Sequence, residues 1–151
     1  MRLTTFSDYS LRVLMYLGAQ PERLVTISEI AAGHGISESH LMKVVHHLGQ
    51  CGLIETIRGK GGGLRLASAP QDIVLGDVIR NTERDFTLVE CFGTNATCRI
   101  PGACLLNTIL REALNAMFLA LDGYTLADLL MNPQGLIPAS SYPETESQTT
   151  A

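Results

Sequence analysis

Residues 27–66, ISEIAAGHGISESHLMKVVHHLGQCGLIETIRGKGGGLRL, carry the clearest fold pattern of this 151-residue chain. A short helix is expected to begin near Ser28 and to stop at Gly33-His34-Gly35, because glycine permits a left-handed turn there. A second helix is expected from about Glu38 to Gln50, with Ser37 as its N-cap. Its apolar residues recur at helical spacing and predict a buried stripe, made of Leu41, Val44, Val45 and Leu48.

A β-hairpin is expected directly after the second helix, which Cys51-Gly52 ends. Residues 53–57 are predicted to form one strand, 58–63 a glycine-rich loop and 64–66 the returning strand. A helix–turn–helix followed by a hairpin is the element order of a winged helix-turn-helix. The loop lacks the G-x-x-x-x-G-K-S/T pattern of a phosphate cradle, so nucleotide binding is not expected.

Helices are also expected on both sides of this segment. They are predicted from about Asp8 to Ala19 with Ser7 as N-cap, from Leu75 to Asn81, from Cys104 to Asp122, and from Leu126 to Met131. The helix that begins near Cys104 is apolar over so wide an arc that it must be buried on two faces. One face can pack on its own domain, and a second copy of the chain is the expected partner for the other. The predicted fold class is therefore mainly α with a small β-hairpin wing: a winged helix-turn-helix plus a long dimerisation helix.

Three regions follow from this order of elements. Residues 1–70 are expected to form the DNA-binding lobe, and residues 71–133 a cysteine loop and the dimerisation helix. Residues 134–151 form a tail rich in Pro, Ser and Thr, a composition that favours disorder.

The net charge of −4 is divided unevenly along the chain. Residues 1–70 hold seven Lys/Arg and five Asp/Glu, whereas residues 71–151 hold four and ten. A weakly basic front half with an acidic rear half fits DNA binding confined to one lobe, and it excludes a polycationic coat on DNA. Because the chain shows no apolar signal region and no stretch near the roughly 18 apolar residues of a membrane span, a cytoplasmic protein is expected.

The polar side of the second helix and the wing are the candidate DNA-reading surface. The N-terminal residues of a recognition helix face base edges in the major groove, and an arginine on a wing can enter a narrow minor groove. The histidines at 34, 46 and 47 are expected at the surface or at helix ends. Winged helices also serve as protein-interaction modules, so protein binding is an alternative. An enzyme is not expected, because the sequence shows no nucleophile grouped with a base. The candidate DNA contacts are Ser37, Ser39, His40, Lys43, Arg58 and Lys60.

Cys91, Cys98 and Cys104 lie within fourteen positions of an irregular, glycine-containing segment. In a reducing compartment, closely spaced thiols are more often metal ligands or redox sensors than structural disulfides. Zinc sites usually carry a tight Cys-x2–4-Cys pair, which is missing here, and the wider spacing suits an iron–sulfur cluster. Zinc and free thiols remain the alternatives. Three thiolates leave one ligand of a four-iron cluster to be found, and Cys51 is expected to be a buried packing residue.

These features together resemble the iron–sulfur winged-helix repressors of bacteria, and most closely the NsrR group of nitric oxide sensors. The resemblance spans about residues 1–133. IscR-type regulators of cluster biosynthesis are relatives of the same family. The resemblance to this family rests on the three cysteines and on residues 3–9, 27–30, 40–43, 58–63 and 124–129.

The resemblance implies a homodimeric repressor that carries one iron–sulfur cluster per subunit, of the 4Fe–4S type, and loses DNA affinity when nitric oxide reacts with it. It also implies that Asp8, supplied by the other subunit, is the missing ligand. A local role for Asp8 is the alternative: stabilising the start of its helix and pairing with Arg12 four residues on. The alternative function is a regulator of iron–sulfur status or redox state that uses a 2Fe–2S cluster or thiols. A near-palindromic operator is expected for a dimer of this class.

Overall fold

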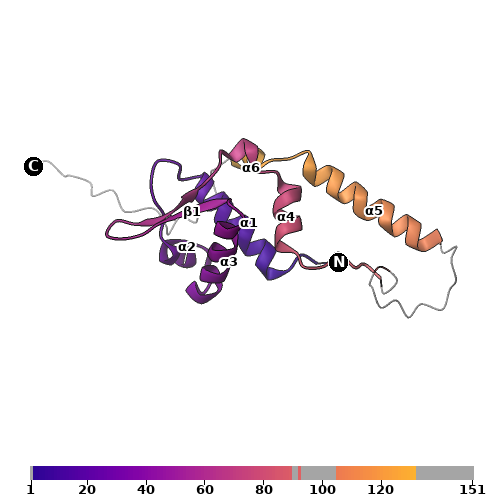
Figure 1. The fold of residues 1–151 in the computed structure, drawn as a ribbon, viewed down its shortest axis with the longest axis horizontal. Helices are drawn as coiled ribbons and strands as arrows, with labels where there is room; N and C mark the ends of the chain where they lie inside the picture. The colour runs from indigo at the N-terminus through magenta and orange to yellow at the C-terminus, as the bar shows by residue number, and fades with distance from the viewer. Residues whose placement is uncertain (1, 90–91, 93–104, 132–151) are drawn as a thin grey trace, which may run out of the picture.

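The computed structural model describes residues 2–89, 92 and 105–131. Six α-helices, one 3-10 helix and a two-stranded sheet appear in this part of the chain (Figure 1). Their bounds are α1 Thr5–Gly18, α2 Ile27–His34, α3 Glu38–Gln50, β1 Ile54–Ile57, β2 Gly63–Leu66, η1 Pro70–Asp72, α4 Leu75–Thr82, α5 Leu105–Asp122 and α6 Leu126–Leu130. The predicted fold class, mainly helical with a small hairpin wing, is confirmed.

The helix–turn–helix forms as the sequence predicts. Thr26 caps α2 by accepting a hydrogen bond from the backbone N–H of Glu29 at 3.2 Å. Gly35 then ends α2 with φ of 63°, a conformation that glycine adopts without strain. Helix α3 has the predicted bounds, although its N-cap residue Ser37 makes no side-chain capping bond.

Helix α1 begins three residues before the predicted start at Asp8, and the predicted N-cap is wrong. Thr4 is the cap, because its hydroxyl accepts from the backbone N–H of Ser7 at 3.3 Å. Ser7 is fully buried and helical. Thr4, Thr5 and Ser7 all lie near the start of this helix, and the hydroxyl of Thr4 makes the capping bond.

The wing is an antiparallel pair in which Ile54 lies opposite Leu66 and Ile57 opposite Gly63. The buried Leu64 joins the hairpin to the segment before α2, because its N–H and C=O exchange hydrogen bonds with Val25 at 2.7 and 3.0 Å. The loop between the strands projects away from the helices (Figure 1).

A single hydrophobic core holds α1, α2, α3 and the wing together, and it continues beyond residue 70. Ile73, Val78 and Leu126 are buried in the same cluster as the residues of the first three helices. Leu126 N–H donates to the carbonyl of Ile73 at 2.8 Å, and Leu75 N–H donates to that of Tyr124 at 3.0 Å. Residues on both sides of position 70 therefore share one core. The predicted boundary at residue 70 stays a prediction about function, between a DNA-binding lobe and a cluster-binding lobe.

Helix α5 runs outward from α4 and leaves the rest of the molecule toward its N-terminal end (Figure 1). None of its residues is buried, so the predicted burial on two faces is not met within one chain. No helix in the described ranges is long and apolar enough to cross a membrane.

Candidate nucleic-acid interface and metal site

The N-terminal half of α3 presents the predicted base-reading residues to solvent. Ser37, Ser39, His40 and Lys43 are all exposed. On the opposite side, Leu41, Val44, Val45 and Leu48 are buried in the core. The helix is thus fixed by its apolar stripe, and a polar face is left free to enter a groove of DNA.

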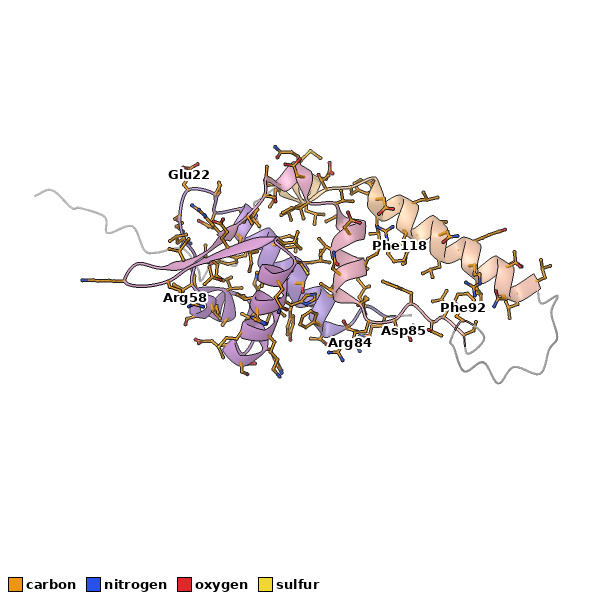
Figure 2. The ribbon with its side chains drawn as sticks, in the orientation of Figure 1. Glu22, Arg58, Arg84, Asp85, Phe92 and Phe118 are labelled. Atoms are coloured by element: carbon orange, nitrogen blue, oxygen red, sulfur yellow. The ribbon has the colours of Figure 1, made fainter. Side chains whose placement is uncertain are left out.

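The wing presents two further cations. Arg58, labelled in Figure 2, and Lys60 are exposed on the hairpin, and neither makes an ion pair within the described residues. Arg65, also on the hairpin, is instead paired across the strands with Glu55 at 2.7 Å. Gly59 and Gly61 flank Lys60 with φ of 101° and 78°, so the turn that carries the cations requires glycine on both sides.

We expect Gly62→Ala to impair DNA binding through the shape of the wing. An added Cβ would lie 2.2 Å from the carbonyl oxygen of Ile57 and 3.0 Å from that of Gly59, so the backbone of the turn must shift. DNA affinity should fall about tenfold, which corresponds to losing ~1.4 kcal/mol of contacts, while helix content by circular dichroism stays unchanged. Gly49→Ala is the matched control, since its Cβ would meet nothing closer than 4.0 Å. Equal DNA affinity of the two variants would contradict the prediction.

The three predicted thiolate ligands, Cys91, Cys98 and Cys104, lie outside the described residues. The chain on either side of them is described. Phe92, the neighbour of Cys91 in sequence, donates its N–H to the carbonyl of Val89 at 2.9 Å and packs its ring under the guanidinium of Arg111 at 4.6 Å (Figure 2). Phe92, next to Cys91, is thereby attached to α5. No sequence pattern predicts this contact.

Asp8 lies in the first turn of α1, and its carboxylate accepts from Arg12 Nε at 2.9 Å. The predicted i,i+4 pairing is therefore present. Both side chains are nearly half exposed, at 49% and 43%, so the carboxylate is still open to a second partner. Asp8 borders a hollow of about 690 Å³ that Arg2, Tyr9 and His34 also line. Within residues 2–89, 92 and 105–131, no three His, Cys, Asp or Glu side chains gather as a metal site.

His34 ends α2, as expected of a helix-end histidine, but it is half-buried. Its ring stands edge-on to Tyr16 at 5.7 Å, and its Nε2 has no hydrogen-bond partner within the described residues. Burial lowers the pKa of His34, and the nearby Arg12 lowers it further, while Asp8 opposes them. A neutral imidazole therefore stands beside the hollow that Asp8 borders.

The sequence also did not predict an ion pair that joins α4 to α5. Arg80 donates to both carboxylate oxygens of Asp122 at 2.7 Å, and its guanidinium lies 4.4 Å from the centre of the Phe118 ring. The hydrogen bonds from Arg80 lower the pKa of Asp122. Figure 2 shows Phe118 on the side of α5 that faces α4. The partners are 42 residues apart in sequence, and a lone arginine gives no sign of such a contact.

An exposed recognition helix followed by a cationic wing defines a DNA-binding regulator of the winged helix-turn-helix class. Residues 3–132 match the family model Rrf2, described as "Iron-dependent Transcriptional regulator". The chain belongs to the Rrf2 family. It is therefore a transcriptional regulator and not an enzyme, as the sequence predicted.

Curated relatives confirm the resemblance to the NsrR group. The chain is 50% identical over 139 residues to the HTH-type transcriptional regulator NsrR of Bacillus subtilis, covering 91% of this chain and 95% of the relative. It is 52% identical over 132 residues to NsrR of Geobacillus kaustophilus, covering 86% and 90%. The chain is thus an NsrR-type regulator of the Rrf2 family.

Solved structures confirm the fold. The global cysteine regulator CymR of B. subtilis matches with a TM-score of 0.72 at 28% identity, covering 85% of this chain and 95% of that one. IscR of T. potens matches with a TM-score of 0.69 at 29% identity, covering 86% of each chain.

Proposed function

We propose that this chain is a homodimeric repressor that holds one 4Fe–4S cluster per subunit and loses operator affinity when nitric oxide reacts with that cluster. The observation that carries the proposal is that an exposed recognition helix and three clustered cysteines occur in the same chain. This chain is 50% identical, over 91% of its length, to a regulator named NsrR. A repressor of this kind acts in the cytoplasm, where bacterial DNA is found.

The donor set suits an iron–sulfur cluster. Cysteine thiolates are the usual ligands of such clusters, and Cys91, Cys98 and Cys104 supply three of them. Asp8 of the partner subunit is the proposed fourth ligand, supported by its half-exposed carboxylate beside an open hollow. When bound, the cluster supplies iron that nitric oxide can reach. A carboxylate ligand, weaker than a thiolate, favours such reactivity.

A second copy of the chain is the proposed partner of α5. Leu105, Leu106, Ile109 and Leu119 of this helix are between 50% and 74% exposed. An apolar strip of this size left in water is unfavourable by about 25 cal/mol for each Å². Pairing with the same strip of another subunit removes it from water and makes a self-complementary, two-fold interface.

The dimer would place two recognition helices about 34 Å apart, one turn of DNA, on a near-palindromic operator. We propose that Ser37, Ser39 and His40 read base edges and that Lys43 contacts phosphate. Arg58 would enter the minor groove, and Lys60 would contact the backbone beside it. All six side chains are exposed in the structure, which supports these roles.

The test is an anaerobic purification in which iron and sulfide are counted per chain. DNA affinity is then measured before and after nitric oxide, on a duplex that the untreated protein has selected from a random-sequence pool. We expect about four irons and four sulfides per chain and a fall in affinity of at least about tenfold, or ~1.4 kcal/mol. Two irons per chain would favour the 2Fe–2S alternative. A colourless protein that still binds DNA would leave a zinc-based or thiol-based repressor.

A further inference from the structure

The C-terminal end of α4 is hydrogen-bonded to α3 and to the N-cap of α1, two helices of the DNA-binding lobe. Glu83 Oε1 accepts hydrogen bonds from the N–H and the hydroxyl of Thr4, the N-cap of α1, at 2.6 and 3.1 Å. His47 Nε2 lies 2.8 Å from the carbonyl oxygen of Asn81. Because a carbonyl oxygen can only accept, His47 Nε2 carries the proton and donates.

His47 belongs to the recognition helix and shares a face with its candidate DNA contacts. It follows Lys43 by four residues and His40 by seven, which are helical spacings. The exposure changes along this face. His40 and Lys43 are exposed, whereas His47 is half-buried, with its ring edge-on to Phe6 of α1 at 5.3 Å. One end of α3 thus faces solvent, and the other is attached to α1 and to the end of α4.

The same end of α4 leads directly into the cysteine segment. Cys91 follows Glu83 by eight residues. Between them, Phe86 packs edge-on to Phe118 of α5 at 4.8 Å. Figure 2 places Arg84 and Asp85 in the stretch that runs from α4 toward α5. The end of α4 is therefore joined along the chain to the cysteine segment and by hydrogen bonds to α1 and α3.

We propose that His47 is a positioning residue that links the recognition helix to the end of α4 and so makes DNA affinity depend on the state of the cysteine segment. This inference rests on the proposed function. The bond goes to a backbone carbonyl, so it reports where the α4 chain lies. It is an exposed polar bond beside a hollow of about 480 Å³, which leaves room for the end of α4 to move. The buried stripe of α3 keeps the helix in the core while its orientation changes.

The paired variants His47→Leu and His47→Gln test the link. Leucine keeps an apolar contact with Phe6 but cannot donate, whereas the glutamine amide can place a donor near the position of Nε2. For each protein, iron and sulfide are counted, and DNA affinity is measured for the cluster-loaded and the nitric oxide-treated form on the duplex selected by the wild type.

We expect both variants to retain full iron and sulfide. In His47→Leu the affinity of the loaded form should fall toward that of the treated form, so that the ratio between them shrinks about three- to tenfold, as for one lost hydrogen bond. His47→Gln should restore most of the ratio. If His47 merely contacted DNA or stabilised the fold, both forms would weaken together and the ratio would stay at the wild-type value, which would overturn the inference.

The wild-type measurement tests the proposed function alone. If the wild-type protein bound DNA equally well in its cluster-loaded and nitric oxide-treated forms, the proposed function would be contradicted whatever the His47 variants did. A second measurement covers the case in which His47→Leu does not fold. The imidazole ¹⁵N spectrum of the wild-type protein should show a hydrogen-bonded Nε2–H in the loaded form and its loss after nitric oxide. An unchanged His47 signal would overturn the inference.

Discussion

Replacing Leu106 and Ile109 together with glutamate is expected to convert the dimer into a monomer and to lower DNA affinity by more than about 100-fold. The two side chains are 58% and 50% exposed in a single chain, so the charges cost little in the monomer. In the proposed dimer the same charges would be buried without partners, at a cost of several kcal/mol. A monomer reads one half-site and forfeits the contacts of the other. Sedimentation and a DNA titration measure both effects.

Asn115→Glu provides the control for this pair, because Asn115 lies on the same helix and is exposed but polar. It should leave the dimer and its DNA affinity intact. If the double variant also remained a dimer at low micromolar concentration, α5 would not be the dimer interface, and its apolar strip would need another occupant.

Replacing Cys98 with serine is expected to remove nearly all iron and sulfide and to leave the protein with the DNA affinity of its nitric oxide-treated form. Serine is a poor ligand because its hydroxyl remains protonated at neutral pH, so two thiolates would be left to hold the cluster. Cys51→Ser is the matched control. Cys51 lies at the end of α3, 3.6 Å from His47 Nε2, and is half-buried where the sequence predicted a buried residue. Iron loss in both variants, or in neither, would contradict the proposed ligand set.

The fourth ligand is tested in the same assay by comparing Asp8→Ala with Arg12→Ala. Both changes break the 2.9 Å ion pair within α1, but only the first removes the carboxylate. Asp8→Ala should lower cluster stability and alter the nitric oxide response, whereas Arg12→Ala should leave both close to wild type. Equal behaviour of the two variants would mean that Asp8 serves only its own helix.

Local chemistry was enough to predict most of the fold. The apolar stripe of α3, the glycine that ends α2 and the glycine-rich turn of the wing each act over a few residues, so spacing and residue type predicted them. The predicted start of α1 was wrong, because Thr4 and Ser7 can both cap a helix and only the structure shows Ser7 inside the helix with Thr4 as its cap. The exposure of the candidate contacts on α3 was predictable for the same local reason, since polar residues opposite a buried stripe must face outward.

Residue type and spacing alone predict the winged helix-turn-helix, its exposed polar face and three clustered thiols. The bonds that join these parts are visible only in the folded chain: His47 to Asn81, Thr4 to Glu83, and Arg80 to Asp122. These contacts join residues 34 to 79 positions apart. Helical and strand periods describe which way a side chain points along its own element. The partner it meets is set by the packing of the shared core, which no local pattern contains.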